Sequence, residues 1–123
     1  MTHHLDLSQL LWTAEQVPGD PQADDLGVLI AGSARTQARA CNHEVYGSVP
    51  LKAAALMQTL ALLAPLERSN KAFAFASARA FMKANGLRLQ PPPDELRKVL
   101  ASIAPGAAGV RALSEHLHRW AQR

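Results

Sequence analysis

The chain has 123 residues, of which 48% are hydrophobic and 19% are charged, and its formal net charge is +3. This length suits one domain rather than two, and the charge is too small to indicate a nucleic-acid-binding surface by itself. Wholesale disorder is excluded by the high apolar content, and the longest nearly uncharged stretch, residues 53–65, is too short for a membrane span of about 20 residues. Aromatic residues make up only 5%, so the core has to be aliphatic and rich in alanine, which favours close-packed helices.

The single cysteine, Cys41, excludes an internal disulfide and a zinc site built from cysteines. The N-terminal residues have neither the basic flank nor the apolar segment of a secretory signal. We therefore expect a cytoplasmic protein.

The first two predicted helices begin at acidic residues. Asp6 precedes a helix with apolar residues at spacings of three and four, which should end before the turn sequence of residues 18–21. Asp24 and Asp25 open the second helix, where their charges lie near its positive end. Periodicity fades in residues 37–47, which are predicted to form a loop.

A central helix is predicted from residues 51–63. Ser48 followed by Pro50 is typical of a helix start, with proline in the first turn. The residues that follow are apolar nearly all round, so this helix should be enclosed by the others.

A second central helix is predicted from residues 70–84, after a break at residues 64–68. Ser69 is expected to cap it, and Gly86 to end it in a left-handed conformation. The short run of residues 87–89 is insufficient to predict a strand.

Two further helices follow. Prolines 91–93 with Asp94 and Glu95 start one that has a clean apolar face and ends before Pro105, and another runs from about Gly109. The sequence thus predicts an all-α fold: a compact single domain over residues 1–123, a bundle of about six helices with two buried helices at its centre.

The junction of residues 64–72 is where the spacing suggests a functional site. A loop leads directly into the N-terminus of a buried helix, where free backbone N–H groups can bind phosphate or carboxylate. The residues expected to hold an anion there are Arg68, Ser69, Asn70 and Lys71, with Arg79 at the border. In the alternative, purely structural interpretation, Ser69 only caps the helix and Lys71 is solvated.

Residues 64–72, Ala-Pro-Leu-Glu-Arg-Ser-Asn-Lys-Ala, resemble the signature of Fic/Doc proteins, which is His-Pro-Phe-x-Asp/Asn-Gly/Ala-Asn-Gly/Lys-Arg. Residues 81–86, Phe-Met-Lys-Ala-Asn-Gly, resemble the Phe-Leu-x-x-Asn-Gly that follows it in Doc ("death on curing") toxins. Residues 10–15, 25–29 and 46–55 are similar to the corresponding early segments of bacterial Doc-like proteins. The last helix also matches in position, so the resemblance spans nearly the whole chain.

The resemblance implies the Fic/Doc fold and transfer of AMP or phosphate from ATP. In that family the motif histidine is the base, the acidic position helps to hold Mg²⁺, and the final arginine grips phosphate. The Fic enzymes transfer AMP, whereas the Doc branch, with lysine where Fic has glycine, phosphorylates elongation factor Tu. Here the histidine position is Ala64, the acidic position is Arg68 and the arginine position is Ala72. The positions that agree are Pro65, Ser69, Asn70 and Lys71.

The departures from the motif predict an impaired enzyme. Loss of the base at Ala64 alone should cost on the order of 10²–10⁴ in rate, and an arginine at 68 would repel Mg²⁺. We expect no intact catalytic residue, no metal site, and weak binding of ATP or another nucleotide without Mg²⁺. An alanine at 64 is also what deliberate inactivation would install, but its coincidence with Arg68 and Ala72 favours natural decay.

Several other residues were candidates for chemistry. Glu67, and His43 with Glu44 in the loop before the central helices, are possible replacement bases, although a solvated role is the better expectation for each. The histidines of the last helix are two apart and should point different ways, which disfavours a metal site. Trp12 and Trp120 are expected to pack in the core or in a groove, and Cys41 to be an inert thiol.

Two functions remain open from the sequence. The first is a Doc-like protein of a toxin–antitoxin module that is catalytically impaired and acts by binding protein. The alternative is an active Doc-type toxin that transfers phosphate or AMP from ATP to a hydroxyl of a translation factor. No base-reading helix-turn-helix is evident, so direct DNA binding is not expected.

The partner that the resemblance implies is a small antitoxin-like protein with an acidic segment that folds into a groove on binding. The net charge of +3 supports an acidic partner independently, because it would speed the encounter. The candidates for basic residues along the rim of the groove are Arg35, Arg39, Lys83 and Arg88.

Overall fold

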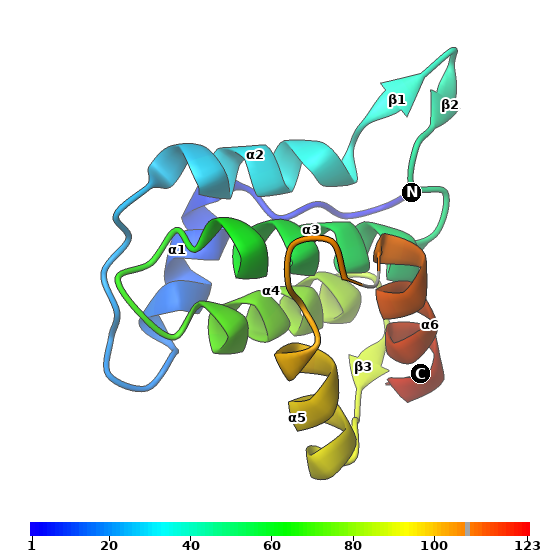
Figure 1. Ribbon diagram of the computed structural model, residues 1–123. Coiled ribbons are helices and arrows are strands. Elements are labelled where there is room, and N and C mark those ends of the chain that lie inside the picture. The colour runs from blue at the N-terminus through cyan, green and yellow to red at the C-terminus, as the bar shows by residue number, and fades with distance from the viewer. Residues whose placement is uncertain (108) are drawn as a thin grey trace.

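A computed structural model describes residues 1–107 and 109–123 and shows a bundle of helices (Figure 1). The helices are α1 (Leu7–Glu15), α2 (Leu26–Thr36), α3 (Val49–Leu63), α4 (Asn70–Ala84), α5 (Pro93–Ala101) and α6 (Val110–Trp120). Four two-residue strands, β1 (Arg39–Ala40), β2 (His43–Glu44), β3 (Arg88–Leu89) and β4 (Ala121–Gln122), form two small antiparallel pairs. The expected all-α fold with six helices is confirmed.

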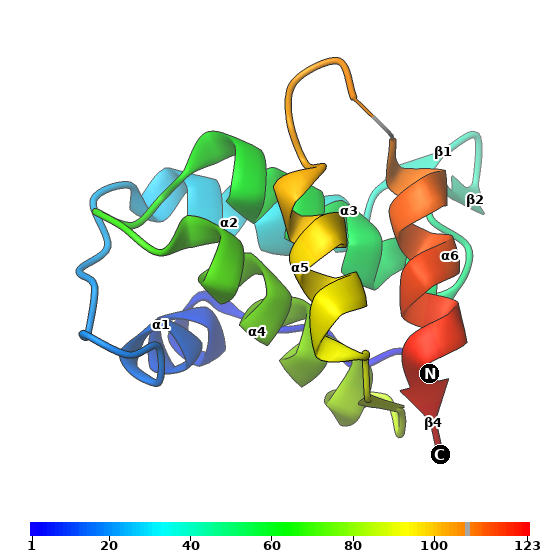
Figure 2. The ribbon, with the colours of Figure 1, turned by 60° about the horizontal axis from the view of Figure 1, so that its bottom comes forward.

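The antiparallel helices α3 and α4 form the centre of the bundle. Helix α2 lies along α3, α1 lies against α4, and α6 packs on α3 from another side (Figures 1 and 2). The centre is closed by fully buried residues of α3 and α4, including Ala54, Met57, Leu60, Phe73 and Phe81. The two central helices were therefore predicted correctly.

Local caps account for where the helices begin and end. Asp6 forms a capping box with Gln9 at the start of α1, and Asp25 and Ser48 accept hydrogen bonds from backbone N–H groups of α2 and α3. Gly86 has φ of 84° after the end of α4, as expected for a left-handed terminus. These caps were all read from the sequence.

Two predictions about the connections need correction. Residues 37–47 are more than a loop, because β1 and β2 pair with Arg39 opposite Glu44 around a turn at Cys41 and Asn42, both with positive φ. Residues 88–89 form a strand because their partner, Ala121–Gln122, follows α6 directly and pairs with them. Among the described residues, no helix is both long and apolar enough to cross a membrane.

Candidate functional site

The candidate site lies at the corner between α3 and α4. Helix α3 ends at Ala64, which adopts the left-handed conformation with φ of 45° and ψ of 66°. Its backbone N–H still bonds to the carbonyl of Leu60, at 3.2 Å, so the chain leaves the helix in a sharp turn. Ala64 is exposed, and Pro65 and Leu66 then turn inward and are buried.

The side chain of Asn70 closes the corner. Its Oδ1 accepts a hydrogen bond from the backbone N–H of Leu66 at 2.8 Å, and its Nδ2 donates to the carbonyl of the same residue at 3.0 Å. Leu66 is only 3% exposed, so its main-chain groups would otherwise lack a partner. Asn70 therefore acts on the backbone of the corner rather than pointing a free amide outward.

The segment before α2 holds the corner from outside. The carbonyl of Pro65 accepts hydrogen bonds from the backbone N–H groups of Asp24, at 2.8 Å, and Asp25, at 3.1 Å. The backbone N–H of Glu67 bonds to the carbonyl of Gln22 at 2.9 Å. The corner and residues 22–25 thus form one backbone-bonded unit, in which the start of α2 is fixed against the end of α3.

The charged side chains of the corner are turned toward this outer segment. Arg68 Nη1 lies 2.6 Å from Glu67 Oε1, and Arg68 Nη2 donates to the carbonyl of Gly19. Glu67 Oε1 also accepts a hydrogen bond from the backbone N–H of Gln22 at 3.1 Å. Both side chains remain partly exposed, at 53% and 39%, so this pair is a surface link of modest strength.

The start of α4 differs from the prediction. Ser69 adopts a left-handed conformation with φ of 62°, and its side chain makes no capping hydrogen bond, so the expectation that it caps the helix is wrong. The reason is its left-handed backbone, which differs from the extended conformation in which an N-cap side chain reaches the first N–H groups of a helix. Ser69 and Lys71 are exposed at this helix start, and Asn70 is half-buried.

Arg79 does not border the start of α4, contrary to the expectation. It lies more than two turns along the helix, where its guanidinium is 4.8 Å from the ring centroid of Phe75 and donates to the carbonyl of Leu89 at 3.4 Å. Of the four residues expected to hold an anion, Ser69 and Lys71 are exposed at the helix start, while Arg68 and Asn70 serve the corner itself.

The other candidate bases lie elsewhere. His43 and Glu44 belong to the β1–β2 hairpin at the opposite end of α3, so they cannot reach Ala64. Among the described residues, no group of three or more His, Cys, Asp or Glu side chains is placed to hold a metal ion. The carboxylate nearest the corner is Glu67, which is engaged by Arg68.

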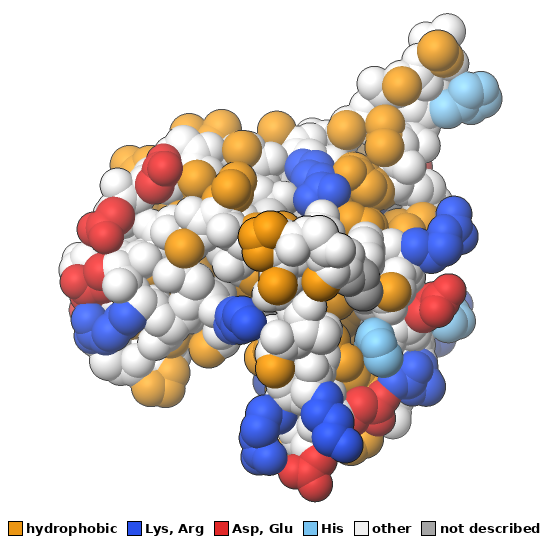
Figure 3. Space-filling view, in the orientation of Figure 1, with side chains coloured by type: hydrophobic (Ala, Val, Ile, Leu, Met, Phe, Trp, Pro, Cys, Tyr) orange, Lys and Arg blue, Asp and Glu red, His pale blue; other side chains and the backbone are white. Residues whose placement is uncertain are grey.

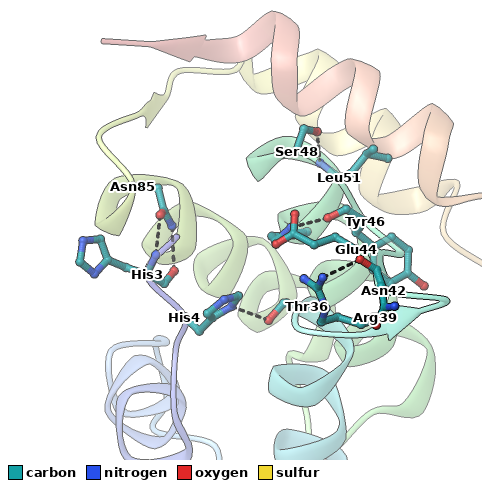
Figure 4. A network of polar contacts seen from close by, with 11 residues as sticks. His3, His4, Thr36, Arg39, Asn42, Glu44, Tyr46, Ser48, Leu51 and Asn85 are labelled. Carbon is teal, nitrogen blue, oxygen red and sulfur yellow. Dashed lines mark hydrogen bonds and ion pairs between the residues drawn. The ribbon is translucent and has the colours of Figure 1, made fainter. Parts of the chain in front are cut away.

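A polar network at the start of α3 was missed by the sequence analysis (Figure 4). Lys52, in the first turn of the otherwise apolar helix α3, is 2% exposed, and its Nζ lies 3.0 Å from Glu44 Oε2 and donates to the carbonyl of Tyr46. This hydrogen bond from Lys52 is the main reason that the pKa of Glu44 is lowered from its usual range. The network ties the hairpin to the core.

Arg35, expected on the rim of a partner groove, belongs to a similar network. Its guanidinium donates to the Tyr46 hydroxyl at 2.8 Å, the Ala55 carbonyl at 3.2 Å, and the side chains of Gln58 at 2.9 Å and Thr59 at 3.0 Å. A side chain held by four acceptors links α2 to α3 and is not available to a partner. That prediction is wrong for Arg35.

Helices α1 and α4 together present an apolar surface around Trp12. Trp12 is 62% exposed, so of the two expected places, core or groove, it does not occupy the core; it stands between two hollows of about 440 Å³ each. One hollow reaches from Leu5 to Ala80 and Lys83, and the other lies on the side of Leu11. We call this the Trp12 surface, meaning the lining of these two hollows. Trp120, in contrast, is 3% exposed and belongs to the core.

Comparison with known proteins gives one match of note. The chain is 38% identical over 91 residues to a protein named Toxin Doc of Mycolicibacterium smegmatis (strain ATCC 700084 / mc(2)155). The alignment covers 72% of this chain and 69% of that protein. No family model matches the chain.

Proposed function

Because the chain belongs to the family of Doc toxins, we propose that it is the Doc-like component of a toxin–antitoxin module and that it acts by binding protein rather than by catalysis. The observation that carries the second half of this proposal is the corner between α3 and α4. Its polar side chains are engaged in holding the chain, and its exposed turn residue is Ala64.

Phosphoryl and nucleotidyl transfer need a base at the attacking hydroxyl and positive charge or metal at the phosphates. The methyl group of Ala64 accepts no proton. Arg68 brings a positive charge where the motif has a metal-binding acid, and it is turned toward Glu67 and Gly19. These features support a site with little or no transferase activity.

Residual anion binding at the start of α4 is part of the proposal. Lys71 is exposed there, and the first N–H groups of the helix provide the usual attraction for an anion. Because the acidic position of the motif is Arg68 and Glu67 is paired with it, nucleotide binding should be weak and independent of Mg²⁺. Calorimetry with ATP tests this, and strong Mg²⁺-dependent binding would contradict it.

The test of catalysis is transfer of label from ATP to purified elongation factor Tu, assayed separately with γ-phosphate-labelled ATP for phosphorylation and with α-phosphate-labelled ATP for AMP transfer. We expect no transfer above background by the natural chain in either assay. Label transfer that disappears in Lys71→Ala would refute the proposal and favour the alternative, an active Doc-type toxin. The combined variant Ala64→His, Arg68→Asp, Ala72→Arg restores the motif and serves as a positive control, since histidine tolerates the left-handed conformation at position 64 better than most residues.

For the antitoxin-like partner we propose the Trp12 surface as the docking site. It offers an exposed aromatic ring between two hollows, with Lys83 at its edge, which suits an amphipathic segment with acidic residues. Of the four rim residues expected from the sequence, Lys83 is the one at this surface; Arg39 lies on the hairpin and Arg88 on β3.

Co-purification with the product of the adjacent gene tests the docking site. Trp12→Ala and Lys83→Glu should each weaken retention of the partner, because one removes the aromatic anchor and the other reverses the rim charge. Arg97→Glu, an equally drastic change at an exposed residue of α5, is the matched control and should retain it. Equal retention by all three variants would show that the partner docks elsewhere.

A further inference from the structure

A second pocket lies at the other end of the bundle, where α6 crosses the start of α3. Its volume is about 670 Å³, which falls within the range of small-molecule sites. Helix α3 has 15 residues, so its two ends are about 22 Å apart. The pocket is therefore separate from the corner at Ala64 and from the Trp12 surface.

The floor of this pocket is apolar. Pro50 and Leu51 at the start of α3, Leu87 before β3 and Ala121 in β4 supply it, and all four are only partly buried. They stay partly open because α6 turns its apolar stripe, Leu113 and its neighbours, to the core and not to this gap. An uncovered apolar floor favours a ligand with an aliphatic body.

The wall carries positive charge. Arg111 and His118 extend from the exposed face of α6, and Arg123 lies beyond β4. Neither guanidinium has a carboxylate within 4 Å in the part of the chain that the structure describes. Among the Asp, Glu, Lys and Arg side chains of the lining, Arg111 and Arg123 stand against Glu115, an excess of one positive charge.

The net positive charge of the chain lies in the segment that contributes α6 and β4 to this pocket. Residues 88–123 contain six Lys and Arg against three Asp and Glu, whereas residues 1–87 contain seven of each. The excess of positive charge thus comes from the segment that forms α5, α6 and the β3–β4 pair, and Lys and Arg side chains gather there in Figure 3. Such a surface attracts anions.

We propose that this pocket binds a singly charged aliphatic carboxylate, with its chain on the apolar floor and its carboxylate at Arg111. A guanidinium group matches a carboxylate in hydrogen-bonding geometry, and an excess of one positive charge in the lining suits one negative charge better than the two of a phosphate monoester. This inference goes beyond the proposed function and is independent of it.

The experiment is calorimetric titration of the full chain with octanoate, with butanoate and octylammonium as matched probes. Octanoate should bind with one site per chain and at least tenfold more tightly than either, since butanoate lacks most of the aliphatic body and octylammonium has the wrong charge. Arg111→Ala should weaken octanoate binding about tenfold, while Arg97→Ala, which removes an exposed arginine outside the pocket, should leave it within about twofold.

A second measurement separates this pocket from the Trp12 surface, with which it shares no lining residue. Octanoate should raise the melting temperature of Trp12→Ala as much as that of the natural chain, because a ligand that binds only the folded state stabilises it. Loss of binding in Trp12→Ala with retention in Arg111→Ala would place the ligand on the Trp12 surface and overturn the proposal. Equal binding of octanoate and octylammonium would also overturn it.

Discussion

The role of Asn70 can be tested by its effect on stability. Replacing it with alanine removes two hydrogen bonds to the backbone of Leu66, at 2.8 and 3.0 Å, and leaves the main-chain groups of a buried residue without these partners. Each such bond contributes about 1 kcal/mol, and alanine regains about 0.5 kcal/mol of helix propensity. The free energy of unfolding should therefore fall by about 1.5 kcal/mol, which for a chain of this size lowers the melting temperature by about 6 °C.

Urea and thermal unfolding followed by circular dichroism at 222 nm measure this difference without any ligand. Lys71→Ala, at the next and exposed position, is the matched control and should change the free energy of unfolding by less than about 0.5 kcal/mol. Asn70→Asp keeps the acceptor for the Leu66 N–H and loses the donor, so it should fall between the two. If Asn70→Ala unfolds like Lys71→Ala, Asn70 does not hold the corner, and its amide is free for a ligand after all.

Three further outcomes follow from other parts of the molecule. Because the pKa of Glu44 is lowered, its pairing with Lys52 stabilises the fold above the usual carboxyl pKa, and this stabilisation is lost as pH falls through the folded-state pKa. Glu44→Gln should therefore remove this part of the acid sensitivity in urea titrations from pH 7 to pH 3. An unchanged pH profile would count against the pairing. Leu29→Ala, at a fully buried position of α2, should lower the free energy of unfolding by about 3 kcal/mol. The side chain of Ile30 is 54% exposed, so Ile30→Ala should lower it by less than about 1 kcal/mol. Similar losses in the two variants would contradict the assignment of the buried face of α2. Gly86→Ala should cost about 1 kcal/mol by the same assay, because φ is 84° there although no atom lies near the added methyl; no loss would argue against a left-handed residue.

The helices were predictable because their signals are local. Asp6, Asp25 and Ser48 each cap a helix within three residues, and the apolar content of α3 is visible within its own sequence. Short-range capping and apolar pattern decide where such helices begin and which of them are enclosed. The packing of the helices in the fold is consistent with these local signals.

The features that were missed depend on partners distant in the sequence or in loops without periodicity. Lys52 lies in an apolar helix, and no neighbouring residue of the helix indicates that its ammonium group pairs with Glu44 and donates to the carbonyl of Tyr46. The strand at Leu89 exists only because Ala121 pairs with it. Within the candidate site, Ser69 makes no capping hydrogen bond, and the side chain that holds the turn is Asn70, which bonds to the main chain of Leu66 rather than to the helix.

The corner also explains how the fold can be kept while its chemistry changes. The groups that hold it are the carbonyl of Pro65, the backbone of Leu66 and the amide of Asn70, all partly or fully buried. The side chains of Ala64 and Ala72, in contrast, are exposed; a substitution at position 72 should change stability by less than about 0.5 kcal/mol, whereas position 64 is the left-handed C-cap of α3 and disfavours β-branched residues. Position 72 can therefore vary with little effect on the turn, and position 64 can vary among residues that tolerate the left-handed conformation, so keeping the fold does not by itself require a base or a phosphate-binding arginine at these positions.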